Sequence, residues 1–237
     1  MDQGIVIIPT YNEKGNIQKI IEAVFVQDIG LHILVVDDNS PDGTADIVRN
    51  LQKLHPDTLH LLNRKKKEGL GTAYIAGFKW CLERDYTYIF EMDADFSHNP
   101  ADLKRLLKAC QKGADMSVGS RYVSGGEVSN WDYKRIMISY FASLYVRIIL
   151  WIGVKDSTAG FVCYHRRVLE AINLDKIEFI GYAFQIEMKY NAIKKGFKIV
   201  EVPIIFIDRQ VGQSKMSMKI FTEAFFGVIK MRFRSIS

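Results

Sequence analysis

Two acidic residues near the middle of the chain have the spacing of a metal-binding pair. Asp93 ends the apolar run 86–93, and Asp95 follows one residue later. Carboxylates at the end of a buried strand are costly to keep ionised unless a cation joins them. Mg²⁺ and Mn²⁺ take oxygen ligands of this kind and bridge to substrate phosphates. The pair therefore predicts a site for a divalent metal, Mg or Mn, that binds a phosphate-bearing substrate.

Three further loops in the N-terminal half carry side chains suited to a nucleotide. Tyr11 and Glu13 follow the apolar run 4–9 and suit a base and a ribose, although a turn with a helix cap is the alternative. The acidic loop 36–44 is not a calcium loop, because Pro41 stands where an oxygen ligand is required. Residues 64–71 place cations and glycines before an expected helix, which is typical of phosphate binding. Its GLG does not match the GxGxxG of dinucleotide-binding folds.

The elements that must position these loops alternate along the first 120 residues or so. Apolar, β-branched runs predict strands over 4–9, 32–38, 58–64, 86–93 and 114–121. Helical spacing predicts helices over 16–27, 46–54, 71–83 and 102–110. Five such units predict an α/β fold with a mostly parallel sheet and helices on both faces. Ligands of such sheets bind beyond the carboxyl ends of the strands, where the loops above lie.

The rest of the chain does not continue the regular alternation of strands and helices. We expect a loop over 124–130, a long helix over 132–154, a strand over 160–165 and an amphipathic helix over 182–196. A strand over 198–207 contains Pro203, which suggests an edge or a bulge, and a last helix spans 216–233. No linker separates these parts, so we expect one domain.

Composition and charge limit the class of protein. The chain has 237 residues, 48% apolar and 25% charged, which is ordinary for a globular protein. Three scattered cysteines argue against a disulfide scaffold or structural zinc. We find no signal peptide and no apolar run long enough to span a membrane, so we expect a soluble or peripheral protein on the cytoplasmic side.

The positive charge is concentrated at the C-terminal end. The net charge is +5, and six basic residues against one acid follow position 208. This excess of basic residues at the C-terminal end predicts one anionic partner. An equally good explanation is that the residues form a solvated helix face. The helix 216–233 has bulky apolar residues along one face and cations at its ends, which fits contact with a membrane as well as it fits core packing.

Taken in order, the motifs resemble a known family. PTYNE, VVDDNSPDGT, GLGTAY, MDADFSH and GSRY look like the nucleotide-sugar half of family 2 glycosyltransferases, which have the GT-A fold. Lys134-Arg135, DSTAGF (156–161), FIDR (206–209) and GQSK (212–215) resemble the dolichol-phosphate (polyprenyl-phosphate) mannose synthases of that family. The resemblance implies an inverting, metal-dependent transfer of mannose from GDP-mannose to a polyprenyl phosphate. It implies one catalytic domain over 1–237, with a donor half (1–123), an acceptor half (124–215) and a basic helix (216–237).

The resemblance also assigns residues. The donor would be held by Pro9, Tyr11, Asn12, Glu13, Val36, Asp38, Gly71, Asp93, Ala94, Asp95 and Arg121. The acceptor phosphate would be surrounded by Arg135, Ser139, Arg209, Ser214 and Lys215. The metal would be bound by Asp93, Asp95 and Ser97, where some relatives carry glutamine at the last position. The catalytic residues would be Asp93, Asp95, Arg121 and Arg209.

Partners and alternatives follow from the same resemblance. The expected partners are GDP-mannose, a polyprenyl phosphate lipid and the cytoplasmic face of a membrane, and a small membrane subunit is left open. Nucleic acid is not expected, because no RNP-type aromatic motif or zinc spacing occurs. One alternative is a family 2 enzyme with another donor, such as UDP-glucose, or with a hydroxyl acceptor that would need a general base. The other is a basic nucleotide-binding module without enzymatic activity.

Overall fold

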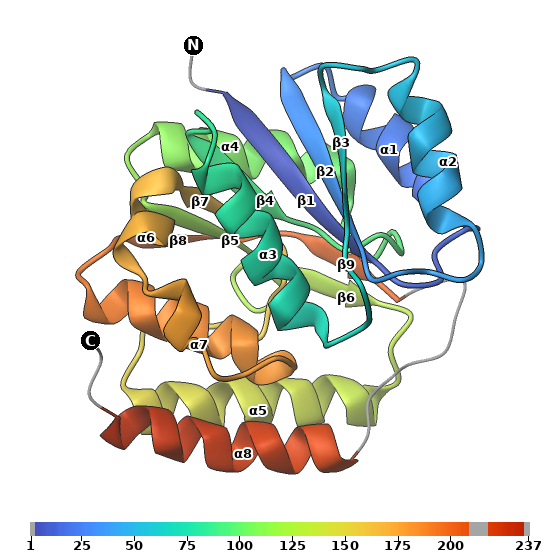
Figure 1. Cartoon of the computed structure of the whole chain (residues 1–237). Helices are drawn as coiled ribbons and strands as arrows, with labels where there is room; N and C mark the ends of the chain where they lie inside the picture. The colour runs from blue at the N-terminus through green and yellow to red at the C-terminus, as the bar shows by residue number, and fades with distance from the viewer. Residues whose placement is uncertain (1–2, 209–217, 235–237) are drawn as a thin grey trace.

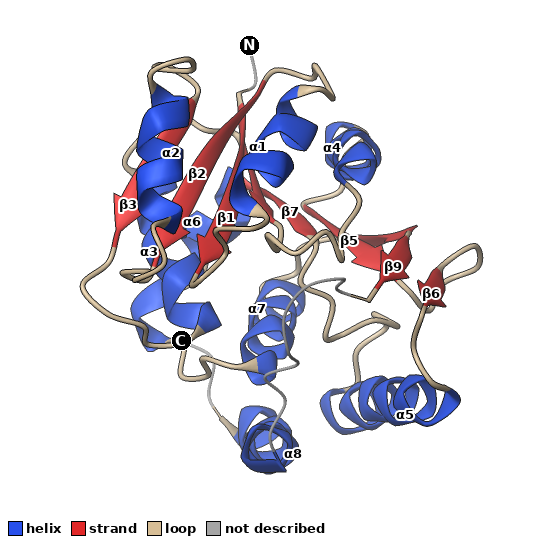
Figure 2. Cartoon of the chain, turned by 90° about the vertical axis from the view of Figure 1, so that its right-hand side faces the viewer, coloured by secondary structure: helices blue, strands red, loops and turns tan. Residues whose placement is uncertain are grey.

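The computed structural model describes residues 3–208 and 218–234 (Figures 1 and 2). Its centre is a seven-stranded sheet in the order β3-β2-β1-β4-β7-β5-β8. The strands of this sheet are β1 (Gly4–Thr10), β2 (Leu31–Asp37), β3 (Leu59–Asn63), β4 (Tyr88–Glu91), β5 (Met116–Ser120), β7 (Val162–His165) and β8 (Ile199–Pro203). A separate two-stranded ribbon pairs β6 (Glu127–Ser129) with β9 (Ile205–Ile207). The α/β fold with a mostly parallel sheet is therefore confirmed.

Helices cover both faces of the sheet, because its central strands are apolar on both sides. One face packs on α1 (Ile17–Phe25), α2 (Thr44–Gln52) and α4 (Leu103–Gln111). The other face packs on α3 (Leu70–Leu82), α6 (Arg166–Ala171) and α7 (Tyr182–Lys194). Two short 3₁₀ helices, η1 (Pro100–Asp102) and η2 (Leu174–Lys176), precede α4 and α7.

Two long helices form a further layer beyond α7. The helices α5 (Tyr133–Leu150) and α8 (Met218–Phe233) lie side by side and enclose a third apolar cluster together with α7 (Figure 1). The rings of Tyr145 and Phe225 stack with centroids 4.7 Å apart, and the Tyr145 hydroxyl donates to the Phe225 carbonyl. Gly227 lies so close to Phe179 that an added Cβ would stand 2.6 Å from the ring. A glycine is thus what allows α8 to approach the body of the protein.

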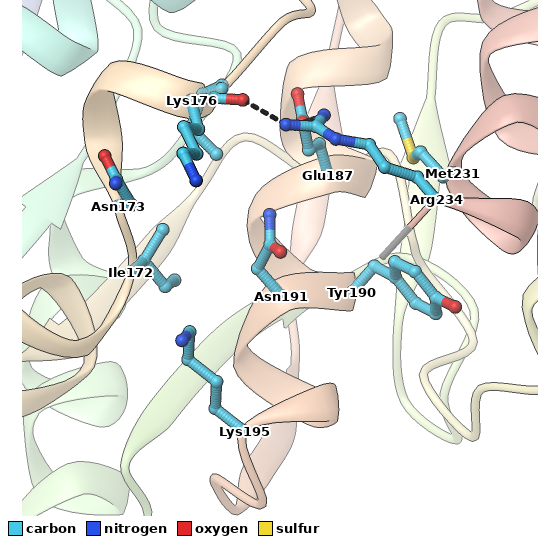
Figure 3. Close-up of a pocket in the computed structure, with 10 residues that line it drawn as sticks. Ile172, Asn173, Lys176, Glu187, Tyr190, Asn191, Lys195, Met231 and Arg234 are labelled. Atoms are coloured by element: carbon cyan, nitrogen blue, oxygen red, sulfur yellow. Dashed lines mark hydrogen bonds and ion pairs between the residues drawn. The ribbon is translucent and has the colours of Figure 1, made fainter. Parts of the chain in front are cut away.

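Ion pairs fix the C-terminal end of α8 on α7 and on the segment before it. The Arg234 guanidinium donates to the Glu187 carboxylate (2.9 Å) and to the Lys176 carbonyl (2.6 Å) beside a small pocket (Figure 3). Lys230 pairs with Glu178 at 2.5 Å. Two cations of the basic end are therefore engaged within the protein.

Three features differ from the expectations. The strand expected over 198–207 is divided into β8 and β9, because Pro203 has no N–H to continue the ladder and the chain leaves β5 after it. The expected edge position of Pro203 is confirmed, since β8 is the last strand of the sheet. The loop expected over 124–130 contains β6, which is too short and too polar to be recognised by periodicity.

The third difference concerns the direction and position of one strand. β7 runs antiparallel and lies between β4 and β5, so the fourth and fifth strands of the chain are not neighbours. The short helix α6 after it was also not expected. This insertion matters for function, because it brings the segment before β7 next to the carboxyl end of β4.

Candidate active site

The predicted metal-binding pair lies in a turn just beyond the carboxyl end of β4. The backbone N–H of Asp93 donates to His98 Nδ1 (3.2 Å), and the N–H of Ser97 donates to Asp95 Oδ1 (3.0 Å). Phe96 has a left-handed backbone (φ 61°), which turns the chain back on itself. Burial lowers the pKa of His98 to about 4, so its ring is neutral at pH 7 and can accept the Asp93 N–H. The turn is thus held by bonds from its backbone N–H groups to its own side chains, and both carboxylates are half-buried.

The residues of this turn fit a divalent ion that a substrate completes. Within residues 3–208 and 218–234, no cluster of three or more His, Cys, Asp or Glu side chains could hold a metal by itself. Two half-buried carboxylates are nevertheless a common protein contribution to a Mg²⁺ or Mn²⁺ site whose other ligands are phosphate oxygens and water. Ser97 is buried beside Asp95, and its role as a metal ligand stays a prediction. Ala94 is buried as well and packs into the core.

A buried polar cluster lies directly beneath the turn. Glu91, the last residue of β4, accepts from the Gln185 amide (2.5 Å) and the Tyr164 hydroxyl (3.1 Å). Burial raises the pKa of Glu91 to about 7. Lys189 is fully buried and donates to the Ala159 carbonyl (2.6 Å), which ties α7 to the segment before β7. These groups were not predicted, although charged residues inside apolar runs are a signal that could have found them.

The loops after β1 and β2 are bonded to each other along the same edge of the sheet. Asp37 accepts from the Thr10 hydroxyl (2.8 Å) and from the hydroxyl and N–H of Ser40. The N–H of Asn12, which is left-handed at φ 61°, donates to Ser40 Oγ, and the Glu13 N–H donates to Thr44 Oγ1. The loop 10–13, in which we expect nucleotide contacts, is therefore anchored by the Thr10 side chain and by its main chain, while Asn12 is exposed and Tyr11 and Glu13 are half-buried.

The expected nucleotide contacts Tyr11, Asp38, Pro9 and Val36 also lie at this edge of the sheet. Lys67 is 4.2 Å above the centre of the Tyr11 ring. Asp38 is buried and accepts from Arg64 Nη1 at 2.7 Å; burial raises the pKa of Asp38, and the Arg64 charge only partly offsets this. Pro9 stands opposite Val36 in the β1–β2 register. The Val36 side chain is wholly buried in the core beneath α3, so this residue can contact a ligand only through its main chain.

Gly71 has a packing role that explains its residue type. Its N–H donates to the Ile180 carbonyl (2.9 Å), and an added Cβ would lie 2.9 Å from the Phe184 ring and 3.0 Å from Ile180 Cα. The amide that we expected to face a donor phosphate thus already has an acceptor. The assignment of Gly71 to the donor stays a prediction, and the structure provides a separate reason for a glycine.

Arg121, at the end of β5, is held by a carboxylate that was not predicted as its partner. Asp156 accepts from the backbone N–H of Arg121 (2.9 Å), from Nε (2.7 Å) and from Nη2 (2.7 Å), while Thr158 Oγ1 also accepts from Nη2. The Asp156 side chain is fully buried. Burial alone would raise the pKa of Asp156, but the charge and hydrogen bonds of Arg121 outweigh it and leave the pKa below its usual value. Asp156 is therefore ionised and engaged, and it is not a candidate general base.

A second guanidinium lies at the start of α5. Arg135 Nη1 pairs with Asp208 at 2.6 Å, and the Arg135 N–H is capped by Asp132. One turn further on, Ser139 Oγ accepts from the Tyr122 hydroxyl at 2.7 Å. Two of the expected acceptor residues are therefore on one helix, next to the residue that follows Arg121. Arg209, Ser214 and Lys215 lie outside the described residues.

Aromatic rings connect the carboxylate turn to both guanidinium groups. The His98 ring stacks on Phe161 (4.9 Å) and meets Phe206 edge-on at 5.7 Å. The Arg121 guanidinium lies 5.4 Å from the Phe206 ring centre. The Ile207 N–H donates to the Ser97 carbonyl (3.3 Å), which joins β9 to the turn. The strand β9 of the ribbon therefore contacts both the turn of Asp93 and Asp95 and the Arg121 guanidinium.

Comparisons with known proteins agree with this arrangement. Residues 5–172 match the sequence profile of glycosyl transferase family 2. The chain is 48% identical to the polyprenol monophosphomannose synthase of Mycolicibacterium smegmatis, over 97% of this chain and 87% of that one. It is 47% identical to the undecaprenyl-phosphate mannosyltransferase of Micrococcus luteus, over 95% and 92% of the two chains.

A solved structure with the same fold is glucosyl-3-phosphoglycerate synthase of Mycobacterium tuberculosis in complex with Mn²⁺, uridine diphosphate and phosphoglyceric acid. It superposes with a TM-score of 0.71 at 14% identity, covering 100% of this chain and 80% of that one. At this identity the likeness shows the fold alone. The profile match over most of the chain and the two relatives at nearly half identity establish the family: this chain belongs to glycosyl transferase family 2.

Proposed function

We propose that this glycosyltransferase transfers mannose from GDP-mannose to a polyprenyl phosphate, giving polyprenyl-phosphate β-mannose and GDP. The observation that carries the proposal is the near-half identity, over almost the whole chain, to two relatives named for mannose transfer to polyprenol or undecaprenyl phosphate. The geometry supports it, because the turn of Asp93 and Asp95 and the guanidinium groups of Arg121 and Arg135 lie around the same aromatic rings, those of Phe206 and Trp131.

On the donor side, main-chain contacts anchor loop 10–13, whose Tyr11 and Glu13 would contact the nucleotide. Asp38, which accepts from Arg64, would offer its carboxylate to the base edge. A divalent ion, Mg or Mn, bound by Asp93 and Asp95 beside Ser97 would neutralise the charge that develops on the GDP leaving group. Arg121, fixed by Asp156, would reach the sugar or phosphate side of the donor and stabilise the charge that develops there.

On the acceptor side, the chemistry favours a phosphate over a hydroxyl. A phosphate monoester is mostly dianionic at pH 7, so it attacks without a general base. It needs cations, because an anion must approach a donor that is itself anionic. Arg135 and Ser139, together with the predicted Arg209, Ser214 and Lys215, would supply that neutralisation. Attack from the face opposite GDP inverts the anomeric carbon.

A surface of α5 and α8 suits the membrane that a lipid acceptor requires. Among the described residues, no helix is long and apolar enough to cross a bilayer. Large apolar side chains are nevertheless exposed on both helices and at the end of α5: Ile138, Tyr140, Phe141, Ile148, Trp151, Phe225, Phe226 and Phe233. Arg232 lies over the Trp151 ring at 5.4 Å. Bulky apolar groups bordered by cations are typical of an interfacial surface, so we propose peripheral binding to the cytoplasmic face of a membrane.

The proposal also assigns a function to each of three segments of the chain. Residues 1–123 would hold the donor, 124–215 the acceptor, and 216–237 would contact the membrane, all within one domain. A small membrane subunit is compatible with the same surface.

The decisive experiment is a panel of radiolabelled donors and acceptors. GDP-mannose, UDP-glucose and UDP-GlcNAc are each offered with a short polyprenyl phosphate and, as the matched acceptor control, with the same polyprenol lacking phosphate. Parallel reactions contain Mg²⁺, Mn²⁺ or a chelator. We expect transfer only from GDP-mannose, only to the phosphate and only with metal. Transfer from UDP-glucose, or to the free polyprenol, would favour another family 2 activity.

A further inference from the structure

One polar atom beside the proposed acceptor cations has no hydrogen-bond partner. Trp131 lies between β6 and the N-cap of α5, and its indole Nε1 is shielded from water without any partner in the described part of the chain. An indole N–H can only donate. Leaving such a donor buried and unpaired is unfavourable, so its retention next to a binding site calls for an explanation.

The surroundings of the Trp131 ring are cationic and aromatic. The Arg135 guanidinium stands 4.0 Å from the ring centre, and that of Arg121 stands 5.6 Å away. Phe206 meets the ring edge-on at 5.5 Å. The carboxylates nearby, Asp156 and Asp208, accept from the two guanidinium groups. Among the described residues the indole N–H has no acceptor, so a ligand at this position can supply one, and the cations on the ring favour an anionic ligand.

We propose that Trp131 is a phosphate-binding residue: its Nε1–H donates to a non-bridging oxygen of the acceptor phosphate, while Arg135, stacked on the same ring, neutralises the charge. The inference rests on the proposed function and adds a residue to its acceptor site. A hydrogen bond to a charged oxygen is stronger than one to a hydroxyl, and a donor-only group cannot accept from one. The indole thus helps to select phosphate over polyprenol.

The same chemistry could come from the diphosphate of the donor, and spectroscopy distinguishes the two sources. The chain has three tryptophans, so ¹⁵N-labelled protein gives three indole N–H signals, and Trp131→Phe identifies the one from Trp131. Short polyprenyl phosphate, the matching polyprenol, GDP with Mg²⁺ and inorganic phosphate are titrated separately. We expect a downfield shift of the Trp131 indole proton with polyprenyl phosphate, and none with polyprenol or GDP.

Kinetics provide the second measurement. Trp131→Phe keeps an aromatic ring for Arg135 and removes only the N–H, so we expect the KM for polyprenyl phosphate to rise about 10- to 100-fold. The Kd for GDP-mannose should stay within about twofold, and the melting temperature should not fall. Trp80→Phe is the matched control, because Arg84 lies 3.7 Å over that ring far from the site. It should leave the acceptor KM unchanged.

Several results would overturn the inference. They are an unchanged acceptor KM in Trp131→Phe, an indole shift that polyprenol produces equally, and a shift that follows GDP. Titrations on the wild-type chain remain informative even if the variant folds poorly. If polyprenyl phosphate shifts the Trp131 signal but no donor gives mannose transfer, the proposed function fails while the phosphate site stands.

Discussion

Replacing Asp156 by asparagine should destabilise the protein and misplace Arg121. The two side chains are 0% and 9% exposed, and the carboxylate accepts three hydrogen bonds from Arg121. Asparagine has nearly the same volume but no charge, and it can satisfy only part of that arrangement. The variant therefore leaves a buried guanidinium without its counter-ion.

The expected loss of stability in Asp156→Asn follows from the burial of the ion pair. Removing one partner of a buried ion pair costs about 3–5 kcal/mol of the free energy of unfolding. At roughly 2–4 °C per kcal/mol for a chain of this size, the melting temperature should fall by about 6–20 °C. Mannose transfer should fall at least about 100-fold even at temperatures where the variant is folded, because Arg121 loses the group that orients it.

A surface pair of the same chemistry is the matched control. Asp46 pairs with Arg49, but their side chains are 75% and 50% exposed. Such a pair contributes about 0–1 kcal/mol, so Asp46→Asn should shift the melting temperature by no more than about 4 °C. Urea unfolding and thermal melts of wild type and both variants measure the difference directly.

The pH dependence provides a separate check on the same pair. The pKa of Asp156 in the folded protein lies below its ordinary value of 3.8, so its ionised form stabilises the fold above that value. The stability gap between wild type and Asp156→Asn should be constant from pH 7 to about 5 and shrink as the pH falls below about 4. A gap at pH 7 no larger than that of Asp46→Asn would refute the buried pair as we describe it.

Three further predictions concern other parts of the molecule. Asp95→Asn should abolish metal-dependent binding of GDP-mannose, measured by calorimetry, with an unchanged melting temperature; wild-type turnover would refute the metal assignment. Gly71→Ala should lower the free energy of unfolding by about 1–3 kcal/mol in urea titrations, because its Cβ would press on Phe184; an unaffected variant would show that this packing is loose. Phe226→Ser should weaken sedimentation with anionic liposomes about tenfold, while Val26→Ser, at an even more exposed residue at the end of α1, should not; equal sedimentation of both variants would argue against the α5–α8 surface.

The parts of the fold predicted from sequence are those whose signal is local. The runs that became β1, β2 and β4 are mostly apolar because both faces of the sheet are covered, and the polar loops after them mark their ends. The antiparallel direction of β7 has no local signal, since it is set by pairing with β4 and β5. The three residues of β6 are recognisable only through their partner β9.

The residues of the site likewise fall into those with a local sequence signal and those that only the fold brings together. Asp93 and Asp95 are two positions apart in the chain and could be proposed as a pair from spacing alone. The partnership of Arg121 with Asp156 joins residues 35 positions apart, and only the insertion of β7 brings them together. Glu91 and Lys189 carried a usable signal, because charged residues at core positions of a strand and a helix contradict the apolar pattern.

The charged residues at core positions lie close together in the structure. Glu91, Lys189 and Asp156 all lie beneath or beside the turn of Asp93, where strands end and the two substrates would meet. An ionised group in the core is tolerated only if its neighbours satisfy it, and here each neighbour is a residue or backbone segment that shapes the site. The bonds that make the Asp156 carboxylate tolerable in the core also hold Arg121 in place before any substrate arrives. A fixed cation need not reorganise when charge develops, which is the condition under which electrostatic stabilisation accelerates a transfer between two anions.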